Sequence, residues 1–216
     1  MTARDEILGR IRRGLKDVPK GSPADDPVPW VYGQPTALDD VPGQFVDRVR
    51  DYKARVEPVA SAADVPAALV SLLADAGVRS VVAPPGVDPV WRQVMAAAGL
   101  DVRVDDPPLS KADLNEVGAV VTTATVGIAE TGTIVLSHGP AEGRRALTLL
   151  PDVHVCVIRA DQVVSDVPEA VARLRPAIDA GRPLTWISGG SATSDIELAR
   201  VEGVHGPRTL LVVLVG

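Results

Sequence analysis

The stretch that decides the fold is Gly127-Ile-Ala-Glu-Thr-Gly-Thr-Ile-Val-Leu136, in which two short apolar runs meet at a turn that contains glycine. With a two-residue loop at Thr131-Gly132, this stretch is a β-hairpin in which Ile128 pairs with Val135. One face then sets Gly and Ala against Ile and Leu, as a hairpin packed on another layer requires. Glu130 lies at the tip and is either a solvated loop residue or an acid that faces a ligand.

Composition indicates a soluble α/β protein. The chain has 216 residues, 46% hydrophobic and 23% charged, which suffices for one domain with an appendage. With a single Phe, the core must be built from Val, Ala and Leu. The net charge of −6 argues against nucleic-acid binding. No apolar run approaches the ~20 residues of a membrane span, and no signal peptide precedes the first helix, so we expect a cytoplasmic protein.

The sequence offers little metal chemistry. One cysteine, Cys156, excludes an iron–sulfur cluster held by this chain alone, because such a cluster takes four thiolates. Cys156 and His154 lie in a strand-like run and are expected to be structural. His138, His154 and His205 are far apart and lack the spacing of a metal site, so we predict no metal.

The chain is expected to divide after residue 42. Apolar residues at helical spacing predict an amphipathic helix over residues 3–16. Six prolines within residues 17–42 predict a linker or an extended arm. Together these form an N-terminal segment, 1–42, ahead of an α/β domain over 43–216.

Helical and strand-like patterns alternate within the predicted domain. We predict helices around Phe45, over 65–76 and 88–98, after Ser110, and over 168–180 and 194–201; strands are predicted over 78–83, 100–104, 117–123, 154–158, 184–187 and 209–215. This alternation is typical of a parallel α/β sheet with right-handed crossovers, and its C-terminal third repeats the pattern. The apolar run 209–215 suits the interior of that sheet.

A second candidate site is Trp186-Ile-Ser-Gly-Gly-Ser-Ala-Thr-Ser-Asp-Ile-Glu-Leu198. Ser194-Asp-Ile-Glu197 matches a capping box, so the Gly/Ser loop leads into a helix N-terminus. Small residues let backbone amides approach a ligand, and the positive end of a helix favours anions, so we predict a phosphate or carboxylate site at the carboxyl ends of the strands. The alternative is a tight turn that needs glycine. Neither a dinucleotide fingerprint nor a P-loop is present.

Two further turns carry ionisable side chains. His205, in Val204-His-Gly-Pro207, suits a hydrogen bond to loop backbone as well as a ligand role. Arg144 and Arg145 follow the hairpin; one of them can pair with Glu130 or with a substrate carboxylate, whereas the other is expected to be solvated. No nucleophile elbow or Ser/His/Asp triad is found.

Four motifs together resemble the lactate utilization protein C family, whose domain is the LUD domain: Gly127-Ile-Ala-Glu-Thr-Gly-Thr133, Arg145-Ala-Leu-Thr-Leu-Leu-Pro151, Gly189-Gly-Ser-Ala-Thr-Ser-Asp-Ile-Glu197 and Gly203-Val-His-Gly-Pro207. The chain departs from that family at Gly190, where relatives usually carry Pro, and at Ser194, where Ala is common. The resemblance implies a three-layer Rossmann-like fold of the NagB/RpiA/CoA-transferase kind with a hairpin excursion. It also implies oxidation of L-lactate to pyruvate with partner subunits that carry iron–sulfur clusters, this chain being the cluster-free member.

Three functions stay open: a cluster-free subunit of a lactate oxidation system that binds a small anion, an autonomous CoA-transferase-like or isomerase-like enzyme with Glu130 as nucleophile or base, and a non-catalytic anion-binding module. The candidate ligand-binding residues are Thr131, Gly132, Thr133, Arg145, Ser188, Gly189, Gly190, Ser191, Thr193, Ser194, Asp195 and His205.

Overall fold

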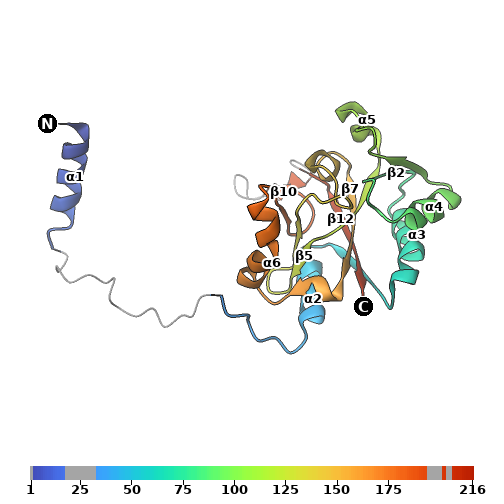
Figure 1. Cartoon of the computed structure of the whole chain (residues 1–216), viewed down its shortest axis with the longest axis horizontal. Coiled ribbons are helices and arrows are strands. Elements are labelled where there is room, and N and C mark those ends of the chain that lie inside the picture. Colours follow the sequence, from blue (N-terminus) through green and yellow to red (C-terminus); the bar gives the residue numbers. More distant parts are fainter. Residues whose placement is uncertain (1, 18–32, 194–200, 203–205) are drawn as a thin grey trace. The chain divides into compact units, whose positions relative to one another are not determined.

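The computed structural model describes residues 2–17, 33–193, 201–202 and 206–216, and the chain divides into two compact units, Met1–Tyr32 and Gly33–Gly216 (Figure 1). The first unit contains the predicted helix, α1 (Ala3–Gly14). Thr2 caps this helix, because its hydroxyl accepts from the Asp5 N–H at 3.3 Å while the Asp5 carboxylate accepts from the Thr2 N–H at 3.0 Å. The division of the chain after residue 42 stays a prediction.

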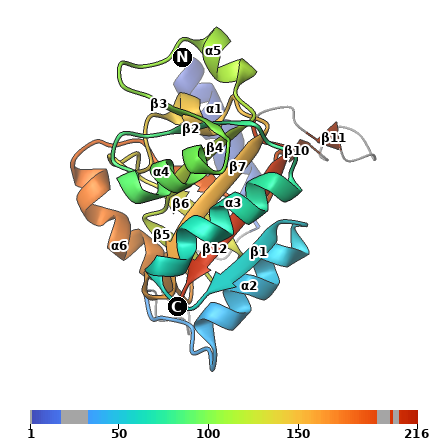
Figure 2. The ribbon, with the colours of Figure 1, turned by 90° about the vertical axis from the view of Figure 1, so that its right-hand side faces the viewer.

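The second unit is built on a parallel six-stranded sheet with the order β1-β12-β7-β4-β2-β3 (Figure 2). Its strands are β1 (Arg55–Val59), β2 (Ser80–Ala83), β3 (Asp101–Val104), β4 (Ala119–Thr123), β7 (Val153–Arg159) and β12 (Thr209–Val215). β12 lies inside the sheet between β1 and β7, as its apolar sequence predicted. The predicted α/β, Rossmann-like class is therefore confirmed.

Helices cover this sheet on both faces. The helices and 3₁₀ turns of the second unit are α2 (Val41–Asp51), η2 (Ala62–Asp64), α3 (Val65–Asp75), α4 (Pro89–Ala97), α5 (Lys111–Glu116), η3 (Arg145–Thr148), η4 (Ala160–Gln162) and α6 (Val167–Asp179). α3 and α4 lie on one face, where Leu69 and Met95 share a core with Val155 and Val213 (Figure 1). α2 packs on the other face.

The predicted hairpin is the centre of a second sheet, with the order β8-β5-β6-β9. β5 (Val126–Ile128) and β6 (Thr133–Leu136) form the hairpin; β8 (Val163–Val164) runs parallel to β5, and β9 (Thr185–Ile187) runs antiparallel to β6. α6 covers the outer face of this sheet. The prediction that residues 184–187 extend the parallel sheet was wrong, because the chain returns from α6 to the hairpin and not to the first sheet.

The hairpin register differs from the predicted one by two residues. Ile128 pairs with Thr133 and not with Val135, so the turn holds the four residues 129–132. A shift of two leaves each side chain on its predicted face, since successive side chains of a strand alternate. The residues predicted to share the inward face are Gly127, Ala129, Ile134 and Leu136, and they pack with the core beneath α2.

Backbone bonds to β8 lengthen the turn. The N–H groups of Ala129 and Glu130 donate to the carbonyl oxygens of Val164 and Ser165 at 2.8 and 3.0 Å. These two residues therefore continue the pairing of β5 with β8 and are drawn away from β6.

The predicted helix over 194–201 lies outside the described residues except for its last residue. Val201 belongs to β11 (Val201–Glu202), which pairs antiparallel with β10 (Ala192–Thr193), so the prediction was wrong at that position.

None of the helices in the described part of the chain combines the length and apolarity needed to cross a membrane.

Gly132 leaves no room for a side chain at the hairpin turn. Its φ is +58°, and an added Cβ would lie 2.6 Å from the backbone carbonyl carbon of Arg48 in α2. Gly77, with φ +68°, has nothing within 4 Å of the same position. We expect Gly77→Ala to lower the free energy of unfolding by about 1–2 kcal/mol, the cost of a left-handed backbone, and Gly132→Ala by about 1–3 kcal/mol more, the cost of overpacking. Urea unfolding measures both, and equal losses would contradict close packing of the turn on α2.

Candidate functional site

A cavity of about 330 Å³ lies where the two sheets meet. β9 and the loop 188–191 form one wall, η3 forms another, and His154 of β7 and Leu210 of β12 form the floor. The predicted ligand residues that line it are Arg145, Ser188, Gly189, Gly190 and Ser191. Two stretches that are more than forty residues apart in the sequence therefore share one site.

The cavity lies near the amino ends of β7 and β12. His154 and Leu210 each follow the first residue of their strand, and they are partners in the register of the sheet. The expectation of a site at the carboxyl ends of the parallel strands was therefore wrong for this loop. The reason is that β9, which the loop follows, belongs to the hairpin sheet.

A chain of hydroxyl groups joins the hairpin to the loop. Thr131 Oγ1 lies 2.7 Å from Thr133 Oγ1, which lies 2.8 Å from Ser188 Oγ. The pairing of β6 with β9 brings these side chains together. Thr133 thus supports a residue that lines the cavity, although Thr131, Gly132 and Thr133 do not line it themselves.

Packing accounts for both glycines of the loop. An added Cβ on Gly189, whose φ is +81°, would lie 2.5 Å from Tyr52 Cβ, and one on Gly190 would lie 2.3 Å from the carbonyl oxygen of Arg208. The Ser191 N–H donates to the carbonyl of Pro207 at 2.8 Å. The tight-turn alternative therefore explains the glycines, and the Ser191 amide is already engaged.

Glu130 is exposed at the hairpin tip. Its backbone N–H is bonded to Ser165, but within the described residues its carboxylate makes no hydrogen bond or ion pair. It does not line the cavity beside Arg145. Its role as a nucleophile or base stays a prediction.

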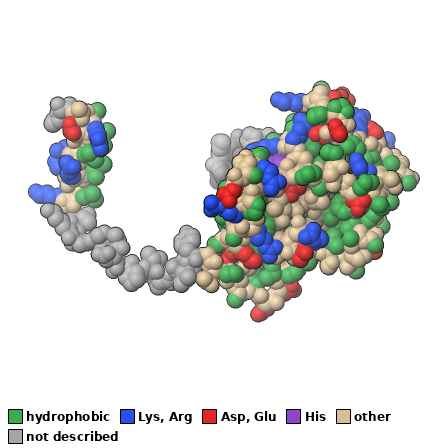
Figure 3. Space-filling view, viewed as in Figure 1, with side chains coloured by type: hydrophobic (Ala, Val, Ile, Leu, Met, Phe, Trp, Pro, Cys, Tyr) green, Lys and Arg blue, Asp and Glu red, His purple; other side chains and the backbone are tan. Residues whose placement is uncertain are grey.

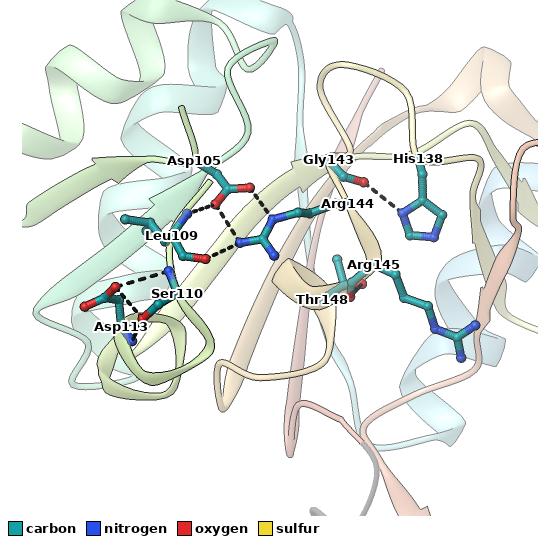
Figure 4. Close-up of polar contacts among 9 residues, drawn as sticks. All are labelled: Asp105, Leu109, Ser110, Asp113, His138, Gly143, Arg144, Arg145 and Thr148. Carbon is teal, nitrogen blue, oxygen red and sulfur yellow. Dashed lines mark hydrogen bonds and ion pairs between the residues drawn. The ribbon is translucent and has the colours of Figure 1, made fainter. Parts of the chain in front are cut away.

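The two adjacent arginines point in opposite directions (Figure 4). Arg144 binds the buried carboxylate of Asp105 through two bonds of 2.7 and 2.9 Å and donates to the Leu109 carbonyl at 2.6 Å. Arg145 is exposed, lines the cavity and has no ion pair within the described ranges. Arg144 therefore has a structural role, because it links its own loop to Asp105 and Leu109. Arg145 is the cation that is available to an anionic ligand.

The floor of the cavity leads into a row of buried polar groups. His154 is 1% exposed, and its Nε2 lies 2.8 Å from Thr122 Oγ1. Burial lowers the pKa of His154 to about 4. Burial also raises the pKa of the Cys156 thiol to about 12, so this cysteine is inert, as expected.

His138 contacts the wall of the cavity that β9 forms. Because the Gly143 carbonyl can only accept, Nδ1 of His138 donates to it at 2.8 Å, and Nε2 contacts Thr185 Oγ1 at 2.8 Å (Figure 4). Sequence reasoning missed Thr148 and Thr185, which line the cavity, and assigned His154 a purely structural role. No local pattern marks these residues, since only the meeting of the two sheets gives them a common surface.

Ser194, Asp195 and His205 lie outside the described residues, and of Thr193 only the backbone is described. No cluster of three or more His, Cys, Asp or Glu side chains suited to a metal ion occurs among the described residues. The face of the second unit drawn in Figure 3 carries basic and acidic side chains interspersed. Among the described residues that line the cavity, Arg145 is the one with a permanently charged side chain.

Comparison with known proteins identifies close relatives. The family model of the LUD domain matches residues 109–215, which include the hairpin, η3 and the loop 188–191. Lactate utilization protein C of Deinococcus radiodurans is 47% identical over 214 residues, 99% of this chain and 96% of that protein. Its namesake of Shouchella clausii is 32% identical over 110 residues, 50% of this chain and 47% of that protein. The crystal structure of a DUF162 family protein from Deinococcus radiodurans matches 84% of this chain and 100% of its own, with a TM-score of 0.71 and 44% identity.

The pair of Asp105 and Arg144 predicts a pH-dependent contribution to stability. Burial alone would raise the pKa of Asp105, but the hydrogen bonds from Arg144 and Leu109 and the charge of Arg144 lower it overall. Since the folded-state pKa is lowered, the pair stabilises the fold above the ordinary carboxyl pKa of about 3.9, and this contribution is lost as the pH falls through the folded-state pKa.

We expect Asp105→Asn to lower the free energy of unfolding at pH 7 by about 2 kcal/mol, as is typical of hydrogen bonds to a charged group, with a difference from wild type that shrinks below pH 4. Asp161→Asn is the matched control, because Asp161 and Arg159 form an exposed pair (side chains 72% and 60% exposed), and it should cost at most about 0.5 kcal/mol. Urea unfolding at pH 7 and pH 3.5 tests both variants. A constant difference across this range would show that the carboxylate charge contributes nothing.

Proposed function

This chain belongs to the lactate utilization protein C family, and we propose that it serves lactate utilization as a subunit that binds a small carboxylate in the cavity beside Arg145. Its nearly full-length similarity to the Deinococcus radiodurans protein supports the role in lactate utilization. The iron–sulfur clusters of the system belong to partner subunits in this proposal, because the chain has a single cysteine and that cysteine is buried. In this proposal, this chain contributes the binding site for a small anion, and the partner subunits contribute the clusters.

The ligand part of the proposal rests on the position of Arg145. A guanidinium group without a carboxylate partner among the described residues lines a cavity of about 330 Å³, a volume within the usual range for small-molecule sites. Arginine binds carboxylates through two parallel N–H bonds, which fixes their orientation. The hydroxyls of Ser188, Thr148 and Thr185 supply further hydrogen-bonding groups on the same walls.

Further positive charge lies on the other side of the loop. Lys53 and Arg208 line a second cavity of about 200 Å³ that shares Gly190 and Ser191 with the first. The only acid paired with Arg208 among the described residues is Asp152, at 3.8 Å, and both side chains are exposed. Cations on both sides of one loop favour the approach of an anion.

Removal of the Arg145 charge should weaken anion binding. We expect Arg145→Gln to bind L-lactate about tenfold or more weakly, since a charge-assisted hydrogen bond contributes about 1.5–3 kcal/mol. Arg175→Gln is the matched control, because Arg175 is an exposed arginine of α6 that pairs with Asp179. Calorimetric titration with L-lactate and with inorganic phosphate measures the affinities, and equal affinities in wild type and Arg145→Gln would remove Arg145 from the site.

The subunit role predicts stable partners. From cells of the source organism grown on lactate, the tagged full-length chain should bring down proteins that carry iron and acid-labile sulfide in stoichiometric amounts. Growth without lactate and an unrelated tagged protein are the controls. If the chain is recovered alone under both growth conditions, the subunit proposal fails even where Arg145 binds an anion.

A further inference from the structure

A further cavity, of about 430 Å³, lies at the carboxyl ends of the parallel strands. Pro85 follows β2 and Asp105 follows β3, and both residues line this space, which we call the carboxyl-end cavity. The turn 138–144 lies over the same ends, because the Gly86 N–H donates to the carbonyl oxygen of Pro140 at 3.0 Å. The other residues that line the cavity include His138, Gly139, Arg144 and Arg182.

This position in the sheet is one where α/β proteins bind ligands. In the order β7-β4-β2-β3, the chain passes from β2 to β3 in one direction, whereas the next strand of this sheet after β4 is β7, in the other direction. The winding therefore reverses between β4 and β2. In open α/β sheets, ligands bind outside the carboxyl ends of the strands at such a reversal. The Thr123 N–H at the end of β4 donates to the carbonyl oxygen of Ala141 at 3.1 Å, so the turn 138–144 reaches both strands.

The carboxyl-end cavity is distinct from the cavity beside Arg145. His138 lines the former and Thr185 lines the latter, and their side chains meet at 2.8 Å. The other ring nitrogen of His138 is bonded to the Gly143 carbonyl, so both nitrogens are engaged. The contact between His138 and Thr185 thus lies between the two cavities, and the adjacent arginines 144 and 145 line different ones.

Two guanidinium groups supply hydrogen-bond donors to the carboxyl-end cavity. Arg144 binds Asp105 and Leu109 through Nε and Nη2 (Figure 4). Its Nη1 makes no hydrogen bond within the described ranges, and its side chain is 37% exposed. Arg182 is exposed and has neither an ion pair nor a side-chain hydrogen bond among the described residues. Its Nη1 would lie 3.7 Å from a Cβ on Gly139, so the guanidinium lies against the turn that lines the cavity.

The charge of the lining favours an anion. Asp105 is the only acid among the described residues that line it, and its two oxygens already accept bonds from Arg144 and from the Leu109 N–H. The positive charge of Arg182 is therefore not offset by any acid of this lining. One guanidinium saturates a planar carboxylate through two parallel bonds, whereas a phosphate group has oxygens left for a second guanidinium.

We propose that the carboxyl-end cavity is a second anion site, which binds the phosphate group of a small phosphomonoester through Arg182 and Nη1 of Arg144. Its volume lies in the usual range for small-molecule sites, so there is room for the body of the ester beside the phosphate. The rings of Pro85 and Pro140 supply apolar surface for that body. This inference goes beyond the proposed function, because it uses neither Arg145 nor lactate.

Chemical modification of arginines by phenylglyoxal, mapped by mass spectrometry of the peptides, locates the bound anion. Phenyl phosphate is the probe, and L-lactate is the comparison. At ten times its dissociation constant, phenyl phosphate should slow the modification of Arg182 about tenfold, since it occupies the site most of the time. L-Lactate should protect Arg145 and leave Arg182 as reactive as in the free protein. Arg175, which pairs with Asp179 on α6, is the internal reference.

Calorimetric titration of the full-length protein measures the contribution of Arg182. In the Arg145→Gln background, which weakens the first cavity, the further change Arg182→Gln should weaken phenyl phosphate binding about tenfold or more, the effect of losing a charge-assisted hydrogen bond. Arg175→Gln in the same background is the matched control and should leave the affinity unchanged. Benzoate, a carboxylate with the same ring, should bind about tenfold more weakly than phenyl phosphate, because it engages one guanidinium instead of two.

The outcomes separate this inference from the proposed function. The second site is overturned if phenyl phosphate does not bind, if it protects Arg145 and not Arg182, or if Arg182→Gln leaves its affinity unchanged. Equal affinities for benzoate and phenyl phosphate would overturn the assignment to phosphate. If L-lactate protects no arginine while phenyl phosphate protects Arg182, the ligand part of the proposed function fails and the second site stands.

Discussion

The hairpin sheet packs so closely against the parallel sheet at Gly127 that even a methyl group there would require the side chains of Ile158 and Phe45 to shift. An added Cβ at this position would lie 2.9 Å from Ile158 Cδ1 and 3.1 Å from Phe45 Cε2. With the two layers in contact, β9 pairs with β6 at the edge of the hairpin. The loop 188–191 that follows β9 then lines the same cavity as His154, near the amino end of β7. The cavity is therefore a consequence of how closely the layers approach, and not a feature of any one loop.

Periodicity and end signals were sufficient to predict most elements of the fold. The helices α4 and α5 begin close to where they were predicted, and Asp88 and Ser110 cap them through contacts between residues two or three positions apart. The destination of β9 could not be predicted in this way. The sequence 184–187 has the same pattern whether it joins the parallel sheet or the hairpin, since hydrophobic periodicity reports burial and not the partner strand.

The site was predictable to the extent that its residues cluster in the sequence. The loop 188–191 was found because four small residues follow a strand. For the pair Arg144 and Arg145, however, the sequence indicated only that one arginine was available. Asp105, 39 positions earlier, decides which one, because it binds Arg144 and leaves its neighbour to the cavity. His154 was judged structural because nothing in a strand sequence tells which side chain will border a cavity.

Because His154 is buried, its ring adds no charge to the cavity near neutral pH. A histidine with a pKa of about 4 stays uncharged from about pH 5 upward, whereas an exposed histidine would gain a proton near pH 6.5. The ring therefore keeps the same charge and the same hydrogen-bonding groups across the pH range in which exposed histidines titrate, so a change in the charge of the cavity within that range would have to come from a group other than His154.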